Sequence, residues 1–332
     1  SSIREVARKA GVSPATVSRV INGTAKVDPA KAEKVLSVIA ETGFKPNELA
    51  RALYKKSSKI IGVIVPNIEN AFFGELARAI EEEAYKNGYH ILLSNSLNDT
   101  DKEVFNISTL NQLHADGIII MTSSEDLKSR IGNCNIPFVI LDREIEGLDE
   151  IACIEADHFK GGILAAQHLL DCGCKNIVCM RGPQHFSSGQ QRFQGYLEVC
   201  RQHGLEERWM DCDYDYEDGL RVAEALLEKY PDADGLIACN DMVAIASYKI
   251  LCKRGLRVPE DIQIIGFDNI RFSRLFTPEF TTIVQPIREL GRMAVSAIIE
   301  NGKGIAVPKK IQFDVSLIER QTTKRKEEKP LI

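Results

Sequence analysis

Polar and aromatic residues follow several strand-like runs in the larger, second part of the sequence. Continuous apolar runs such as IIGVIVP and DIQIIGF alternate there with amphipathic stretches, the pattern of a parallel sheet covered on both faces. Ligand sites of such sheets lie beyond the carboxyl ends of the strands. We therefore expect one site built from the residues that follow these runs, namely Asn70, Phe72, Phe73, Asp142, Arg143, Arg192, Tyr214, Asn240, Asp268 and Gln285.

The chemistry of these side chains suits a polyhydroxylated ligand. Aromatic faces pack against the C–H faces of a sugar ring. Carboxylates accept hydrogen bonds from hydroxyls, whereas arginine and amide groups donate to them. Each residue alone has an ordinary alternative: Phe72 and Phe73 as core residues, Asp268 as a turn residue, Arg192 as a surface charge. Their shared placement at strand ends favours the binding site.

Residues 1–45 predict three short helices. Ser2, Ser13 and Asp28 stand where a side chain can cap a helix start, and Gly11 permits a tight turn between the first two helices. Two short helices joined by such a turn, with a supporting third, form a helix-turn-helix unit. The third helix is expected to pack through its apolar residues Ala32, Val35, Leu36 and Ile39.

The second helix of this unit predicts contact with DNA. In helix-turn-helix units the N-terminal residues of the second helix meet base edges in the major groove. Arg19 can form a bidentate pair with guanine, and the Thr16 methyl group can touch thymine. An ordinary three-helix packing module has the same apolar pattern, so that alternative stays open here. The positions expected to be exposed are Ala15, Thr16, Ser18, Arg19 and Asn22.

Charge separates the two parts of the chain. Residues 1–59 carry 12 Lys and Arg against 5 Asp and Glu, whereas the remainder carries 30 against 42. A basic head on an acidic body favours a polyanionic partner for the head. A merely solvated surface is the alternative.

Residues 46–59 predict a hinge. Pro46 breaks the chain, and Asn47 can cap a helix to about Tyr54 that is too short to be stable alone. Leu49 and Leu53 lie beside cations there, which suits insertion of an apolar side chain into the minor groove, with a solvated linker as the alternative.

The body predicts two doubly wound parallel-sheet lobes in tandem, so the fold class is an all-α head with an α/β body. We expect a helix-turn-helix domain at 1–45, a hinge at 46–59 and an effector-binding and dimerisation domain at 60–332. Its N-lobe spans about 60–158 plus 288–316, and its C-lobe about 159–287 plus 317–330. Helices are expected over 71–87, 101–114, 125–131, 159–172, 190–203, 217–229 and 241–254.

Motifs for catalysis are missing from the sequence. We find no phosphate-binding GxxxxGK[ST] loop, GxGxxG fingerprint, HExxH or GxSxG elbow, and therefore predict no enzyme, no cofactor and no metal. An enzyme acting on a phosphorylated sugar is the disfavoured alternative. Of six histidines, we expect only His185 near the cleft.

Cysteine usage and hydropathy indicate the compartment. The nine cysteines contain no CxxC pair, which argues against a disulfide framework and indicates a reducing cytoplasm. Runs such as NIVCM make Cys179 a small buried apolar residue. No apolar run approaches the ~18 residues of a membrane span, so no membrane partner is expected.

The string SSIREVARKAGVSPATVSRVING, followed by KPNELARALYKKSSKIIGVIVP, resembles the start of the LacI/GalR family of bacterial repressors. This resemblance implies that Thr16, Ser18 and Arg19 read bases and that Asn22 steadies the DNA backbone contact. It also implies DNA contacts by Ala15 and by the hinge residues Ala50 and Leu53, with Leu53 as the minor-groove lever.

The body resembles the periplasmic sugar-binding proteins, and NAFF, LDRE, QRFQGY, ACND, GFDN and TTIVQP resemble the ribose-binding members. The resemblance implies that the residues at the strand ends bind D-ribose or a close pentose, with Tyr214 in place of another aromatic. It implies a homodimeric repressor that leaves a near-palindromic double-stranded operator when ribose binds. The alternative is a global catabolite-type repressor controlled by a phosphorylated carrier protein.

Overall fold

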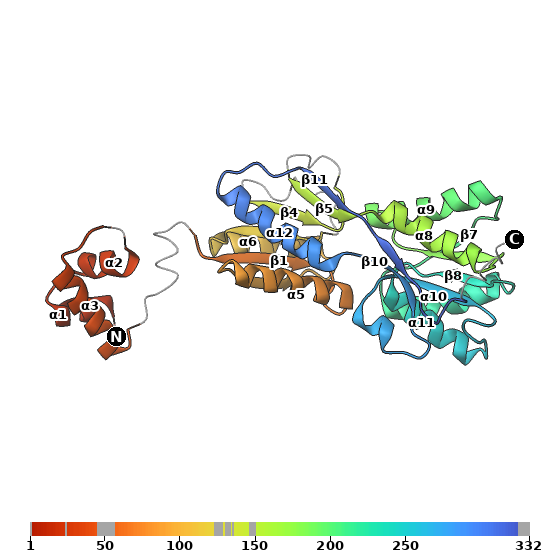
Figure 1. Cartoon of the computed structure of the whole chain (residues 1–332), viewed down its shortest axis with the longest axis horizontal. Helices are drawn as coiled ribbons and strands as arrows, with labels where there is room; N and C mark the ends of the chain where they lie inside the picture. The colour runs from red at the N-terminus through yellow and green to blue at the C-terminus, as the bar shows by residue number, and fades with distance from the viewer. Residues whose placement is uncertain are drawn as a thin grey trace, which may run out of the picture.

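A computed structural model describes residues 2–23, 25–44, 57–122, 129, 134, 136–145 and 151–324. These residues form a three-helix head and an α/β body with two sheets (Figure 1). Across these ranges, no helix is long and apolar enough to cross a lipid bilayer.

The head begins its helices where the sequence predicts. Its elements are α1 (Ile3–Ala10), α2 (Pro14–Asn22) and α3 (Pro29–Thr42). The side chains of Ser2, Ser13 and Asp28 accept hydrogen bonds from backbone N–H groups of the first turn of these helices. Gly11 ends α1 with φ of 66°, the left-handed conformation that favours glycine. The predicted caps and turn are therefore confirmed.

One expectation about the head is wrong. Leu36 is 57% exposed, whereas Val35 and Val38 are buried against α1 and α2. Successive helical residues are rotated by about 100°, so Val35, Val38 and Ile39 share the inward face while Leu36 turns away. The head core is thus built mainly from valine and alanine: Val6, Ala7, Ala10, Val17, Val35 and Val38.

The first lobe of the body is a parallel sheet in the order β11-β5-β4-β3-β1-β2. Helices α5 and α12 cover one face and α6 covers the other, and each face has its own apolar core. The strands are β1 (Ile60–Val65), β2 (His90–Asn95), β3 (Gly117–Ile120), β4 (Phe138–Leu141), β5 (Ala152–Ala156) and β11 (Lys310–Phe313); the helices are α5 (Ala71–Lys86), α6 (Thr100–Gln112) and α12 (Ile287–Gly302).

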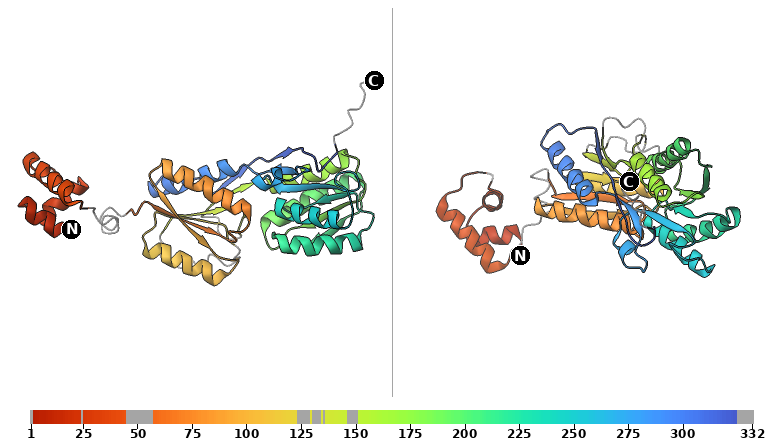
Figure 2. Two further views of the ribbon diagram at one scale, coloured as in Figure 1. Left: turned by 90° about the horizontal axis from the view of Figure 1, so that it is seen from below. Right: turned by 45° about the vertical axis from the view of Figure 1, so that its right-hand side comes forward.

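The second lobe is a sheet in the order β12-β10-β9-β8-β6-β7, parallel except for the edge strand β12. Helices α8 and α9 cover one face and α10 and α11 the other, as the left view of Figure 2 shows. Its strands are β6 (Ile177–Arg181), β7 (Arg208–Asp211), β8 (Gly235–Ile237), β9 (Gln263–Asp268), β10 (Thr281–Val284) and β12 (Ser316–Ile318); its helices are α8 (His158–Asp171), α9 (Ser187–His203), α10 (Tyr216–Lys229), α11 (Asp241–Lys253) and the 3₁₀ turn η1 (Arg271–Arg274).

The chain passes between the lobes three times, from β5 to α8, from β10 to α12 and from β11 to β12. Consequently α12 packs on the first sheet although it follows the second one in sequence. The carboxyl ends of the strands in both lobes meet at the cleft between them.

The sequence did not predict β5, β11 and β12 as strands. β5 contains the buried Glu155, whose Oε1 lies 3.4 Å from Lys310 Nζ, so its pattern is not continuously apolar. β11 and β12 are short edge strands with exposed residues. The predicted hinge helix, with Ala50 and Leu53, lies outside the described residues, as does nearly all of the helix predicted over 125–131.

Helices α8 and α9 approach each other closely at two glycines. A Cβ atom on Gly162 would lie 2.1 Å from the backbone oxygen of Arg192, and one on Gly195 would lie 2.3 Å from that of Phe159. Backbone atoms cannot rotate aside as a side chain can. The packing of α8 on α9 therefore requires glycine at these positions.

Gly162→Ala is expected to destabilise the protein by at least about 1–3 kcal/mol, because the added methyl group forces the two backbones apart. Gly74→Ala is the matched control, since Gly74 lies in α5 and its Cβ would meet no atom within 4 Å. That control should gain about 0.5–1 kcal/mol from better helix propensity. Urea unfolding followed by circular dichroism measures both, and equal midpoints for the two variants would contradict this packing.

Candidate functional site

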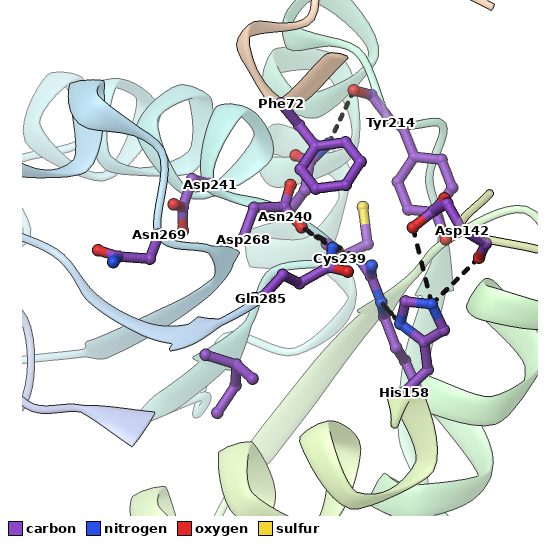
Figure 3. Close-up of polar contacts among 12 residues, drawn as sticks. Phe72, Asp142, His158, Tyr214, Cys239, Asn240, Asp241, Asp268, Asn269 and Gln285 are labelled. Atoms are coloured by element: carbon purple, nitrogen blue, oxygen red, sulfur yellow. Dashed lines mark hydrogen bonds and ion pairs between the residues drawn. The ribbon is translucent and has the colours of Figure 1, made fainter. Parts of the chain in front are cut away.

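All ten residues predicted from the strand ends line one cavity between the lobes. Five of them come from each lobe, and Figure 3 shows several converging from both sides. From the first lobe these are Asn70, Phe72, Phe73, Asp142 and Arg143; from the second they are Arg192, Tyr214, Asn240, Asp268 and Gln285.

Two asparagines connect helix starts to the cleft. Asn70 caps α5 by accepting from the Phe72 N–H at 3.1 Å, and Asn240 caps α11 by accepting from the Val243 N–H at 2.8 Å. The Nδ2 groups of both asparagines donate to the carbonyl oxygen of Tyr214, at 3.4 Å and 2.9 Å respectively. The Tyr214 carbonyl therefore receives one amide from each lobe.

Two buried carboxylates face the cavity from opposite lobes. Asp142 and Asp268 are 5% and 4% exposed and have left-handed backbones, with φ of 71° and 107°. Gln285 Nε2 donates to Asp268 Oδ1 at 2.8 Å. The contacts Arg143 Nε–Asp142 Oδ2 and Arg192 Nη2–Asp268 Oδ1 are each 3.7 Å, longer than hydrogen bonds. Both carboxylates therefore keep lone pairs for hydroxyl donors.

Burial controls the protonation of these carboxylates. Loss of hydration raises the pKa of Asp268 to about 7, although the nearby Arg192 charge and the Gln285 hydrogen bond lower it. Burial also raises the pKa of Asp142 against the opposing charges of Arg143 and Arg192. Additional hydrogen-bond donors, such as the hydroxyl groups of a ligand, would therefore stabilise the charged forms of both carboxylates.

A carbonyl group and an aromatic ring restrain each arginine. Arg143 donates to the Thr122 carbonyl at 2.9 Å, and its guanidinium carbon lies 3.6 Å from the centre of the Phe186 ring. Arg192 donates to the Cys239 carbonyl at 2.7 Å and lies 3.7 Å from the centre of the Phe267 ring. Such stacking restricts the guanidinium planes before any ligand arrives.

The aromatic walls also depend on local packing. The Phe72 and Phe73 rings meet edge to face, with centroids 5.3 Å apart and an interplanar angle of 70°. Tyr214 lies against Gly182 and Gly189, where added Cβ atoms would stand 2.7 Å and 3.2 Å from its hydroxyl oxygen. Glycine at these two positions makes room for the tyrosine ring.

Several buried polar atoms of the cavity have no hydrogen-bond partner within the described residues. They are the Tyr214 hydroxyl, which can donate or accept, together with Asp142 Oδ1, Arg143 Nε and Gln285 Oε1. Buried polar groups are normally hydrogen-bonded, so these atoms indicate a place for a polar ligand. Of the last three, two accept and one donates, and a hydroxyl group can satisfy either kind.

The head presents its predicted contact residues unevenly. Ala15 and Arg19 are exposed, whereas Thr16, Ser18 and Asn22 are partly buried. Thr16 Oγ1 lies 3.0 Å from Ser13 Oγ, and Asn22 Nδ2 donates to Ser18 Oγ at 3.2 Å. These contacts order the polar face of α2.

The expectation that His185 is the only histidine near the cleft is wrong. His158 is fully buried, and its Nε2 lies 3.2 Å from the Asp142 carbonyl oxygen. The sequence contained a usable signal, because His158 follows β5 closely. Since β5 was not recognised as a strand, the residues at its end were not considered. Phe186 and Phe267, which stack on the arginines, were missed as well.

No group of three or more metal-ligating side chains lies together in the part of the chain that the structure describes. The predicted burial of Cys179 is confirmed.

Comparison with known proteins matches both parts of the chain. Residues 58–321 match the periplasmic binding proteins and sugar binding domain of the LacI family, and residues 2–47 match the bacterial regulatory proteins of the lacI family. The chain therefore belongs to the LacI family of bacterial regulatory proteins, which are DNA-binding repressors with a sugar-binding body.

Its relatives are regulators. Ribose operon repressors of Halalkalibacterium halodurans and Bacillus subtilis are 36% and 37% identical, each over 98% of this chain and over 97% and 100% of their own lengths. Catabolite control protein A of Priestia megaterium is 34% identical over 97% of this chain and 99% of its own.

Solved structures share the fold. A LacI-type regulator from Alkaliphilus metalliredigens, complexed with D-xylulofuranose, is 34% identical over 80% of this chain and 100% of its own (TM-score 0.74). A LacI-family regulator from Enterococcus faecium with bound ribose is 28% identical over 80% and 98% (TM-score 0.70). The lac repressor dimer bound to operator and an anti-inducer is 26% identical over 97% and 98% (TM-score 0.85).

Asp268→Asn is expected to change how stability depends on pH. The pKa of Asp268 is raised to about 7 by burial, so the folded state binds its proton more tightly than the unfolded state does. The wild type should therefore gain stability from this group as the pH falls through 7 toward 4. The asparagine variant lacks that gain, so it should be more stable than wild type at pH 8 and lose this advantage at pH 5.

Urea unfolding of both proteins at a series of pH values measures this difference. A stability difference that is constant between pH 5 and pH 8 would show that Asp268 does not titrate with a raised pKa.

Proposed function

We propose that this protein is a homodimeric repressor that binds a near-palindromic operator and is released when D-ribose or a close pentose fills the cleft. The observation that carries the proposal is the single cavity lined by five residues of each lobe, with buried polar atoms that lack partners in the described chain. Similarity to ribose operon repressors and to a ribose-bound regulator supports the choice of sugar.

A chamber beside the cavity favours a neutral sugar over its phosphate ester. It shares Asn70, Phe73, Arg143 and Tyr214 with the cavity. The carboxylates of Asp213 and Asp215 line this chamber. Burial and the neighbouring Asp218 and Asp215 charges raise the pKa of Asp213, as expected in a region of negative potential. A phosphate group entering there would meet like charge.

The head is proposed to read the operator through α2. Ala15, Thr16, Ser18, Arg19 and Asn22 would face the major groove, and Ala50 and Leu53 of the hinge would reach the minor groove. Each chain of the dimer would read one half-site, as two-fold symmetry requires. Similarity to the operator-bound lac repressor dimer supports this arrangement.

Release requires that ribose bind two states of the repressor with different affinity. The cleft offers a physical basis, because its ligand would contact both lobes at once and so fix their relation. The hinge, at 46–59, directly precedes the first strand of the N-lobe, β1. A change between the lobes can therefore alter the position at which the hinge and head join the body. No catalytic step is proposed.

Control by a phosphorylated carrier protein is the second candidate. Similarity to catabolite control protein A is the observation that favours it. It ranks lower because the ribose operon repressors are somewhat more similar, at 36% and 37% identity against 34%.

Calorimetric titration with D-ribose, ribose 5-phosphate and a hexose tests the ligand. D-ribose is expected to bind, ribose 5-phosphate at least about tenfold more weakly because of the acidic chamber, and the hexose more weakly than ribose, as the proposed pentose effector requires. D-ribose should also lower operator affinity in a gel shift, and Asp268→Ala should abolish that response while operator binding persists.

Asp261→Ala is the matched control, because Asp261 is an exposed carboxylate just before the opposite end of β9. It should respond to ribose as the wild type does. If ribose leaves operator affinity unchanged while another small molecule or a phosphorylated carrier protein alters it, the proposed effector is wrong.

A further inference from the structure

His158 lies where the chain first passes from one lobe to the other. It is the first residue of α8, follows β5 directly after Asp157, and its side chain is fully buried. Its imidazole contacts one charged site residue from each lobe. Nδ1 lies 3.3 Å from Arg192 Nε. Nε2 lies 3.2 Å from the carbonyl oxygen of Asp142, and Figure 3 shows the ring of His158 facing Asp142.

These two contacts determine the tautomer of the ring. Arg192 Nε carries a hydrogen and no lone pair, so it donates and Nδ1 must accept without a proton. The single ring proton is then on Nε2, which donates to the Asp142 carbonyl group. Burial lowers the pKa of His158 well below its usual value, and the Arg192 and Arg143 charges lower it further, against the hydrogen bond to Asp142.

The neighbours of the ring hold it in this orientation. The Phe267 ring is 6.0 Å away at an angle of 37°, and the same Phe267 stacks on the Arg192 guanidinium. Asp142 Oδ1 lies 3.7 Å from Nε2. The imidazole therefore spans the space between a backbone group of the first lobe and a guanidinium of the second.

We infer that His158 is a positioning residue that sets Arg192 of one lobe against Asp142 of the other, so that both can contact the same sugar. This inference rests on the proposed function for the identity of the ligand. His158 is fully buried and does not itself line the cavity, so it acts through the two lining residues that it contacts. A neutral ring suits this role, because a protonated Nδ1 would point a hydrogen at the Arg192 donor.

A double-mutant cycle separates positioning from general packing. His158→Phe keeps a ring and removes both hydrogen bonds, and it should weaken D-ribose binding about 10- to 100-fold. Arg192→Lys removes the Nε donor that His158 accepts from. If His158 acts through Arg192, the double variant should bind ribose about as weakly as the weaker single variant. Losses that multiply in the double variant would overturn the inference, as would wild-type affinity in His158→Phe.

His203→Gln is the control, because His203 is exposed and its Nε2 contacts Gln167 rather than a residue of the cavity. It should bind ribose with unchanged affinity.

Nitrogen-15 NMR of histidine-labelled wild-type protein tests the geometry without any ligand. The His158 resonance, assigned by its loss in His158→Gln, should show the Nε2–H neutral tautomer from pH 5.5 to pH 8. A resonance of the Nδ1–H tautomer or of imidazolium in that range would overturn the inference. The NMR measurement needs no sugar, so it tests the geometry around His158 independently of the ligand. Failure of the wild-type protein to bind ribose would refute the proposed function but not this geometry.

Discussion

Four charged side chains are buried together in the cleft, and the cost of removing them from water constrains the structure around them. Asp142, Arg143 and Asp268 are at most 5% exposed, and the Arg192 side chain is 12% exposed. Buried charges are costly unless they are paired and hydrogen-bonded. Here the ion pairs are long at 3.7 Å, and the guanidiniums are held by carbonyl groups and aromatic rings instead. Two of the four groups come from each lobe, and the Arg192 charge of the second lobe opposes the burial cost of the Asp142 carboxylate in the first.

This arrangement explains why the secondary structure around the cleft is so specific. Parallel strands end at one edge of each sheet, which brings side chains from distant parts of the sequence together. The caps Asn70 and Asn240 use their carbonyl oxygens for helix starts and their amide groups for the cleft. Asp142 and Asp268 lie at strand ends and have positive φ angles, and this backbone conformation sets the direction of both carboxylates. A ligand with several hydroxyl groups would supply the hydrogen bonds that these groups still lack.

Sequence reasoning identified the site through one rule, that ligands bind at the carboxyl ends of parallel strands. It located all ten cavity residues because β1, β4, β6, β8, β9 and β10 are apolar runs that can be read directly, and because a short strand was expected just before Tyr214, where β7 lies. It missed His158 because β5 contains a buried glutamate and so was not read as a strand. The charge of that glutamate is balanced by Lys310, which lies far along the chain. It misplaced Leu36 because four apolar residues on one short helix do not show which of them face the core. Pairings between distant residues, such as Arg143 with Phe186, have no local signal.

The central claim is that occupation of the cleft and binding of the operator are coupled through one change between the lobes. Coupling of this kind is reciprocal, so the most direct test measures D-ribose affinity for the free repressor and for the repressor saturated with operator. The account predicts that operator weakens ribose binding by the same factor by which ribose weakens operator binding. Equal ribose affinity for free and operator-bound repressor would contradict it.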